Sequence, residues 1–421
     1  MAVLALLVWF GPATPNVVWP GLFGIATDPN VHLDMLLYAD YAHRIDWGQD
    51  PYSDFAVEYP PLALAMFMAP LAFGWEVLAY RDAFIAITGA MVAATVVLTM
   101  LAARGLGAGR WAQIGAGALV AFGPLLLGHD IAANRYDLLP VFLVALAAFL
   151  AVRGHLTWAA GFAGLGLAAK FWPAVMLVPL AALAHRRAGG NGVARAVGGF
   201  AAAAAIPFAI AAIWGSASGI ADMVQVHADR PLQVEAVGAS VLVVLDGFGL
   251  GGAYVPVGSF GSLNIEGGWA DALPTLLSVI GLALLAAILW LGVRRVRDSA
   301  DHPEAVRWAM TATLASVLSL VVLGKVGSPQ FTLWALPLPF LIAPTRLHWP
   351  AGVLVALSLA LTNVAFRNYL PYGFDYELGP AFLYLFRGLA LVALLVIAVG
   401  ALARGDVTAE RRTGSPSPAA A

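Results

Sequence analysis

Long hydrophobic runs separated by short polar segments make up most of the chain. Crossing about 30 Å of hydrocarbon takes roughly 20 apolar residues in a helix. The longer runs without Asp, Glu, Lys or Arg are 83–103, 111–128, 138–152, 196–221, 272–293, 308–324, 326–345 and 349–366, and 380–403 contains one Arg. Two shorter runs, 156–169 and 171–184, meet at Lys170 and predict a hairpin of short helices. With an N-terminal stretch, the pattern predicts an all-α integral membrane protein with about 11–12 transmembrane helices.

The N-terminal run over residues 1–27 is the weakest of these predicted spans. Pro12, Pro15 and Pro20 interrupt it, and no Lys or Arg precedes it. A secretory signal peptide begins with a basic segment, so its absence argues against a cleaved signal. A truncated start is the alternative that this run leaves open.

Composition supports the membrane assignment and excludes several other classes of protein. Hydrophobic residues make up 61% of the chain and charged residues 11%, against about 25% charged residues in soluble domains. The formal net charge of −2 gives no basic field for a nucleic acid. The chain has no cysteine, which excludes disulfides, thiolate catalysis and zinc-thiolate sites.

The polar loops alternate in charge along the chain. Lys and Arg accumulate on the cytoplasmic side of membrane proteins, and one set of alternate loops holds 14 basic and 5 acidic residues. We therefore expect cytoplasmic N- and C-termini in a cytoplasmic-membrane protein. Residues 1–404 form one polytopic domain in this topology, and the Ser- and Pro-rich residues 405–421 form a disordered cytoplasmic tail. The other loops, at 28–81, 129–137, 222–271 and 367–379 and at the turns around Lys170 and Lys325, lie outside.

The first outer loop is rich in carboxylates and predicts two interfacial helices. Apolar residues recur near helical spacing over 33–47, which predicts an amphipathic helix that ends at Gly48 and Pro51. A second helix begins at the Pro60-Pro61 pair and runs to Phe73. Since it is short for a span, we interpret it as interfacial or re-entrant.

Five motifs on the predicted outer side resemble the GT-C glycosyltransferases that use polyprenyl-phosphate sugars. In order they are Asp34-x-x-x-Tyr38 with Gly48-x-x-Pro51-Tyr52 and Glu58-Tyr59-Pro60-Pro61; Asn134-Arg135-Tyr136-Asp137; Gly164-x-Gly166-x-x-x-Lys170-Phe-Trp-Pro173; Arg230-Pro-Leu-Gln233-Val-Glu235; and Lys325-Val-Gly-Ser328-Pro329-Gln330. They cover residues 28–345. The pattern is similar in particular to glycosyltransferase family 87, which includes actinobacterial mannosyltransferases.

The resemblance implies transfer of a hexose, mannose in the first place, from a polyprenyl phosphate to a glycolipid or glycan acceptor outside the membrane. An aspartate of the first outer loop is implied as the catalytic base, and Asp34 occupies that position, with Asp40 as second choice. Such a reaction needs a base, cations for the departing phosphate and an apolar groove for the lipid. The candidate phosphate ligands are Arg135, Lys170, Arg230 and Lys325, and the candidate substrate contacts are Tyr38, Tyr52, Glu58, Tyr59, Asp137, Gln233, Glu235 and Gln330.

No cofactor or metal is expected, because the lipid-linked sugar is a substrate and neither His32-x-Asp34 nor His129-Asp130 has a spacing that closes a coordination shell.

Structural alternatives exist for each residue. Lys170 could simply extend to the interface, Arg230 could pair with Asp229 or Glu235, and Arg387 could meet a carboxylate.

A transporter or lipid flippase is the alternative class of protein. Transporters carry paired polar sites in two repeated halves, which the sequence does not show. An arabinofuranosyl or glucosyl donor and a non-catalytic paralogue also fit.

Overall fold

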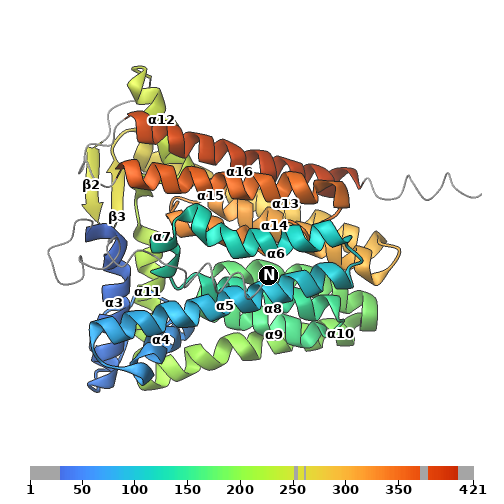
Figure 1. Ribbon diagram of the computed structural model, residues 1–421, viewed down its shortest axis with the longest axis horizontal. Helices are drawn as coiled ribbons and strands as arrows, with labels where there is room; N and C mark the ends of the chain where they lie inside the picture. Colours follow the sequence, from blue (N-terminus) through green and yellow to red (C-terminus); the bar gives the residue numbers. More distant parts are fainter. Residues whose placement is uncertain (1–28, 251–254, 260–261, 370–377, 406–421) are drawn as a thin grey trace, which may run out of the picture.

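The computed structural model describes residues 29–250, 255–259, 262–369 and 378–405. The predicted N-terminal span and the predicted tail from residue 406 lie outside the described residues. Long helices run side by side along one axis, and short helices and a small sheet gather at one end (Figure 1). We call this the site end, and the opposite end, where Arg404 closes the last helix, the basic end.

Among the described residues, seven helical segments are long and apolar enough to cross a membrane. They are α5 (Val77–Gly105), α6 (Arg110–Leu127), Trp172–Trp214, α13 (Trp269–Asp298), α14 (His302–Leu323), Thr345–Arg367 and α16 (Leu378–Arg404). Shorter apolar helices, α8 (Leu138–Val152) and α9 (Leu156–Ala169), pack beside them. The prediction of an all-α polytopic membrane protein is confirmed.

The segment Trp172–Trp214 is two helical arms rather than one long helix. It begins with the 3-10 helix η3 (Trp172–Met176) and continues as α10 (Leu177–Trp214), in which Ala188 and Gly189 leave helical geometry. Gly189 has a φ of 55°, a conformation that glycine adopts without steric penalty. The two arms correspond to the predicted runs 171–184 and 196–221, although the second arm ends at Trp214.

The run 326–345 does not form the predicted helical span. It folds as the 3-10 helix η4 (Pro329–Ala335), a series of turns, and the 3-10 helix η5 (Thr345–Leu347), which leads into α15 (His348–Tyr369). Prolines at 329, 337, 339 and 344 prevent a continuous helix. Nearly every residue from 329 to 344 is buried, because irregular backbone at membrane depth must be covered by protein.

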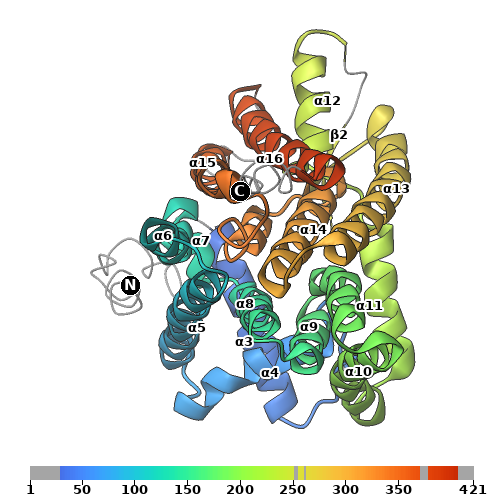
Figure 2. The same cartoon turned by 90° about the vertical axis from the view of Figure 1, so that its right-hand side faces the viewer.

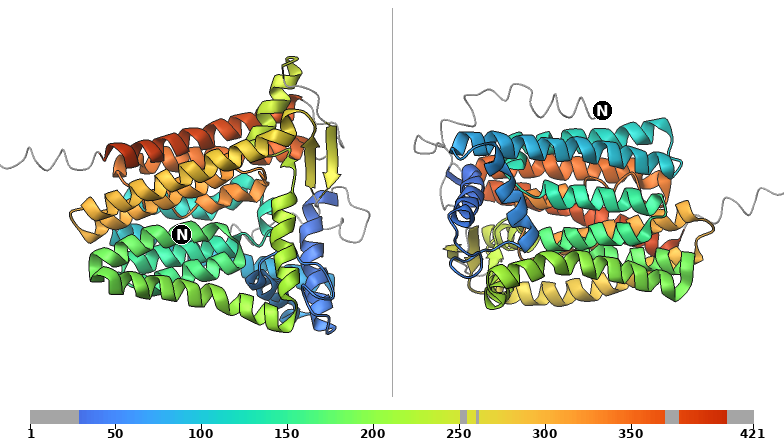
Figure 3. Two further views of the ribbon diagram at one scale, coloured as in Figure 1. Left: turned by 180° about the vertical axis from the view of Figure 1, so that it is seen from behind. Right: turned by 90° about the horizontal axis from the view of Figure 1, so that it is seen from below.

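The site end is built from the predicted outer loops. The first loop forms α3 (Pro29–Asp46), α4 (Pro61–Met68) and the 3-10 helix η2 (Ala69–Phe73), which agrees with the two predicted interfacial helices. The second large loop contains α11 (Ala217–Asp229) and α12 (Val237–Gly247), and α7 (His129–Ala133) lies beside α6 at the same end. Figure 2 and Figure 3 show α11 and α12 at the edge of the helix bundle.

A small antiparallel sheet at the same end was not predicted. Its strands are β1 (Leu232–Gln233), β2 (Val255–Ser259) and β3 (Ser262–Glu266), in the order β1-β3-β2. Asn264 in the middle strand pairs with Gln233 on one side and Val257 on the other. The two-residue β1 is too short to leave a strand signal in the sequence, yet it holds Gln233 and Glu235 against the bundle.

The predicted cytoplasmic loops meet at the basic end through hydrogen bonds between distant segments. Arg186 donates to the carbonyl of Arg297 at 2.7 Å, and Arg295 donates to that of Leu402 at 2.6 Å. Exposed tryptophans lie toward both ends: Trp47, Trp75, Trp214 and Trp269 at the site end, and Trp111, Trp158, Trp290 and Trp349 toward the basic end. Tryptophan is enriched at both membrane interfaces, so the two groups bracket a membrane-spanning layer.

This arrangement predicts the result of accessibility labelling. The chain has no cysteine, so single cysteines introduced at the exposed positions Asp40, Asp229 and Asp298 can be labelled one at a time. We expect a membrane-impermeant maleimide added outside intact cells to label positions 40 and 229 but not 298. Labelling of 40 and 229 from opposite sides would contradict the common site end.

Candidate active site

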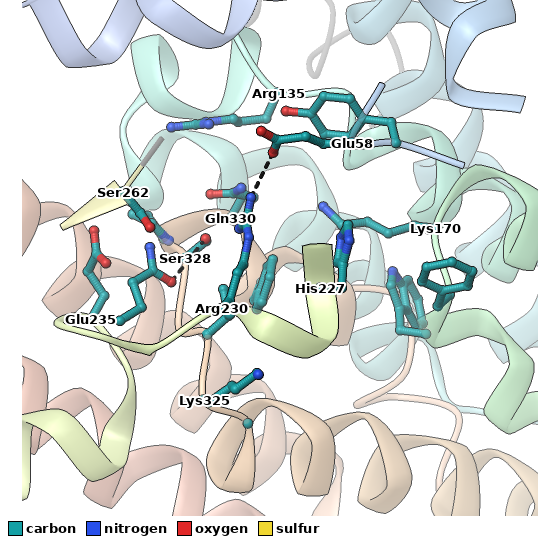
Figure 4. A pocket seen from close by; sticks show the side chains of 18 of the residues that line it. Glu58, Arg135, Lys170, His227, Arg230, Glu235, Ser262, Lys325, Ser328 and Gln330 are labelled. Atoms are coloured by element: carbon teal, nitrogen blue, oxygen red, sulfur yellow. Dashed lines mark hydrogen bonds and ion pairs between the residues drawn. The ribbon is translucent and has the colours of Figure 1, made fainter. Parts of the chain in front are cut away.

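A cavity of about 1130 Å³ opens at the site end (Figure 4). Its walls come from α3, the loop before α4, the turns after α7 and α9, the end of α11, the sheet, and the segment from Gly324 to Trp334. All five sequence motifs therefore contribute to one space. The predicted site residues among the lining are Asp34, Glu58, Tyr59, Arg135, Lys170, Arg230, Gln233, Glu235, Lys325 and Gln330.

Two ion pairs join the first loop to later parts of the chain. Arg135 pairs with Asp34, and both side chains are largely but not fully buried. Arg230 donates from Nη2 to Oε2 of Glu58 at 2.7 Å, across 172 positions of sequence. The partner of Arg230 is thus Glu58, not Asp229 or Glu235 as considered from the sequence. Arg135 and Arg230 are thus each held in place by a carboxylate of the first loop.

Lys170 donates a hydrogen bond to a buried carboxylate that lies behind the cavity wall. Its Nζ donates to Oδ1 of Asp137 at 2.6 Å, and Trp334 Nε1 donates to the same oxygen at 2.7 Å. Asp137 is completely buried. Burial lowers the pKa of Lys170, and the adjacent Asp137 opposes this shift. The interpretation of Lys170 as an exposed interfacial lysine is wrong, since the side chain is directed into the cavity wall.

Two further basic groups complete this side of the cavity. Lys325 donates from Nζ to the carbonyl of Ala228. His227 lies one position earlier on α11, with Nδ1 3.0 Å from the carbonyl of Met223 and its ring against Phe171. Burial lowers the pKa of His227, and the positive charge of Arg230 adds to the shift. His227 was not among the predicted site residues, because it lies three positions before the Arg230 motif and no spacing connects it to that motif.

Glu235 and the residues around it form the opposite wall. The side chain of Glu235 is 7% exposed, and burial raises its pKa to about 7, although Arg387 and Arg135 oppose the shift. Arg387 of α16 is buried and donates to the backbone carbonyls of Gly327 and Glu235. Besides these two backbone oxygens, its positive charge acts on the carboxyl group of Glu235.

The cavity also has an apolar part. Leu320 of α14, Phe366 of α15 and Val175 of η3 line it together with Ala174 and Phe171. These residues lie on the membrane-spanning helices or at their ends, below the charged groups. A space with charges at one end and hydrocarbon at the other suits an amphiphile with a polar headgroup.

A family model matches part of the chain. Residues 57–245, a little less than half of the chain, are similar to glycosyltransferase family 87. The resemblance inferred from the motifs is confirmed for this segment. No curated protein sequence matches the chain at a significant level.

Two solved structures are similar to the chain at low identity. The apo form of the Archaeoglobus fulgidus oligosaccharyltransferase gives a TM-score of 0.45 at 15% identity, covering 95% of this chain and 55% of that chain. The form tethered with an acceptor peptide containing the NVT sequon via a disulfide bond gives 0.44 at 14%, covering 95% and 54%. The chain therefore spans about half the length of these structures.

The family 87 segment contains only part of the cavity. Glu58, Arg135, Lys170, Arg230 and Glu235 fall within residues 57–245. Asp34 precedes the segment, and Lys325 and Gln330 follow it. The structure brings the cavity residues before, within and after this segment together at one end of the bundle. The family match covers only the residues within the segment.

Four predicted site residues do not line the cavity. Asp40 is exposed on α3 and pairs with Arg44 at 2.8 Å, because it lies on a different face of the helix from Asp34. Tyr38 is buried and stacks on Phe67 with ring centroids 4.1 Å apart. Tyr52 is buried, and its hydroxyl donates to the carbonyl of Tyr59 at 2.6 Å.

Asp40, Tyr38, Tyr52 and Asp137 were predicted as site residues, but the structure places them outside the cavity lining. Asp40 is outside the site, whereas Tyr38, Tyr52 and Asp137 lie behind the lining and position Tyr59 and Lys170. Buried tyrosine hydroxyls and carboxylates find partners within the protein, so these side chains are already engaged. Within the described residues, no group of three or more His, Asp or Glu residues could hold a metal ion.

The raised pKa of Glu235 predicts a pH dependence of stability. A carboxyl group with a pKa near 4.5 when unfolded and about 7 when folded binds more protons in the folded state between these values. Its stabilising contribution is therefore complete below about pH 4.5 and is lost as the pH rises through about 7. We expect the wild-type melting temperature in detergent to fall over this interval more steeply than that of Glu235→Gln. Parallel curves for the two proteins would contradict the assignment.

Proposed function

We propose that this protein transfers a hexose from a polyprenyl-phosphate donor to a hydroxyl group of a glycolipid or glycan acceptor. Mannose is the sugar that the resemblance favours, and an arabinofuranosyl or glucosyl donor fits the same groups. The observation that supports the proposal most directly is the polarised cavity. Four cations and an acidic first loop face a space that continues between apolar side chains of the membrane-spanning helices.

In the proposed reaction, Asp34 accepts the proton of the acceptor hydroxyl as that oxygen attacks the anomeric carbon. The bond from this carbon to the phosphate oxygen breaks, and its electron pair stays on the phosphate. One displacement of this kind inverts the anomeric centre. Lys170, Arg230 and Lys325 stabilise the additional negative charge of the departing polyprenyl phosphate, while Arg135 orients Asp34 through their ion pair.

The proposed side of the reaction is extracytoplasmic. The support is the charge asymmetry of the loops: the basic loops meet at the end opposite the cavity, and basic loops are typically cytoplasmic. A lipid-linked donor suits this side, since it carries its own activated sugar and needs no soluble nucleotide.

The test is reconstitution in liposomes with labelled polyprenyl-phosphate mannose and a membrane extract that contains acceptor. We expect release of polyprenyl phosphate together with incorporation of label into a larger glycan. Replacing the donor sugar by glucose or arabinofuranose determines the specificity. Movement of the intact donor across the bilayer without bond cleavage would contradict the transferase and favour the flippase.

A further inference from the structure

The cavity wall opposite Lys170 and His227 differs in chemistry from the rest of the site. Figure 4 shows Glu235, Ser262 and Ser328 on one side and Lys170 and His227 on the other. We call the set Gln233, Glu235, Ser262, Ser328 and Gln330 the acceptor wall, because it presents carboxylate, amide and hydroxyl oxygens. It contains no Lys or Arg.

Two buried oxygens of this wall lack a partner. Oε2 of Glu235 and Oε1 of Gln330 are hydrogen-bonded to nothing in the part of the chain that the structure describes. Their side chains are 7% and 8% exposed, and both line the cavity. Buried polar atoms are nearly always hydrogen-bonded in folded proteins. Because the two side chains border the cavity, a ligand bound in it is the nearest source of the missing donors.

The wall is held rigidly in place. Gly327 donates from its backbone to Oε1 of Gln233 at 2.9 Å, and Gln233 donates from its backbone to the carbonyl of Lys325 at 2.9 Å. Arg387 binds the carbonyls of Gly327 and Glu235 from behind. A side chain at Gly327 would meet the carbonyl of Glu235 at 2.2 Å, so the two loops are in direct contact. The backbone that carries Gln233 and Glu235 is therefore held in place before any ligand binds.

The chemistry of these oxygens selects the ligand. A phosphate diester offers hydrogen-bond acceptors and no donors, so it cannot satisfy the two unpartnered acceptor oxygens of this wall. A neutral ring with several hydroxyl groups offers O–H donors, and a buried site that needs such donors discriminates strongly against ligands without them. The cations of the site remain available to the phosphate.

We propose that the acceptor wall is a sugar-hydroxyl subsite in which Glu235 and Gln330 determine specificity. This inference rests on the proposed function and deepens it by separating sugar recognition from phosphate recognition. The hydroxylated ring comes from the donor sugar or from a sugar of the acceptor, and the binding measurements distinguish the two sources.

The experiment compares two ligands on purified protein in nanodiscs: polyprenyl phosphate and the same lipid with its hexose. We expect Glu235→Gln and Gln330→Leu each to weaken binding of the sugar-bearing lipid about tenfold, the loss of about one hydrogen bond. Binding of bare polyprenyl phosphate should change by less than about twofold by the same reasoning. Two variants are used because they perturb the wall in different ways, and thermal melting checks that each is folded.

Two controls define the background. Asp229→Asn removes an exposed carboxylate just before Arg230, outside the cavity lining, and should change neither affinity. Lys325→Met removes a cation of the site and should weaken both lipids alike. If the wall variants leave donor binding unchanged but raise the KM for the acceptor about tenfold, the subsite binds the acceptor sugar, which also supports the proposal.

The proposal is overturned if the wall variants weaken both lipids equally, or if they change neither lipid affinity nor acceptor KM. If the wild type binds neither lipid, the proposed donor class is wrong as well. The bare lipid therefore separates failure of the subsite from failure of the proposed function.

Discussion

Replacing Asp34 by asparagine is expected to lower glycosyl transfer by about 10²- to 10⁴-fold, the usual contribution of a positioned general base. Asparagine keeps the size of the side chain but cannot accept the acceptor's proton. Binding of the polyprenyl-phosphate donor should persist, since the phosphate ligands Lys170, Arg230 and Lys325 are unchanged. The measurement is single-turnover release of polyprenyl phosphate, with donor affinity determined on the same preparation.

Asp40→Asn is the matched control. It makes the same substitution on the same helix, six positions later, at an exposed residue paired with Arg44. Turnover in this variant should equal that of the wild type. If Asp34→Asn retained full turnover, the base would have to be another carboxylate of the cavity, and Glu58 and Glu235 would be tested next.

The helical part of the fold was predictable because lipid imposes a simple pattern. Runs without charge mark α5, α6, α13 and α14, and a run with one Arg marks α16, since a spanning helix must be predominantly apolar. The same rule failed at 326–345. The residues of this run are equally apolar, but its prolines and its burial among other helices produce an irregular path. Hydropathy alone does not show whether an apolar segment is surrounded by lipid or by protein.

The site was predictable as a set of residues but not as a set of contacts. Charges that collect at one end of a membrane protein are few, so Arg135, Lys170, Arg230 and Lys325 stood out in the sequence. Their partners did not: Arg230 meets Glu58 from a loop 172 positions away, and Asp137 lies behind Lys170 rather than in the cavity. Such pairings depend on tertiary packing, which one sequence does not reveal.

The buried pair of Asp137 and Lys170 gives the second large expected effect. Asp137→Leu removes the carboxylate that accepts hydrogen bonds from Lys170 and Trp334 and leaves a buried ammonium group without its counter-charge. Removing one partner of a buried ion pair destabilises a protein by about 3–5 kcal/mol. We therefore expect a large drop in the melting temperature of the detergent-solubilised protein, accompanied by loss of activity.

The double variant Asp137→Leu/Lys170→Met separates stability from function. Replacing a whole buried ion pair by apolar side chains is often neutral for stability, so the melting temperature should return close to that of the wild type. Activity should not return, because Lys170 lines the cavity as a proposed phosphate ligand. Recovery of both properties would show that the pair acts only in folding. Recovery of stability alone places the ammonium group of Lys170 in the reaction and leaves Asp137 the task of holding it there.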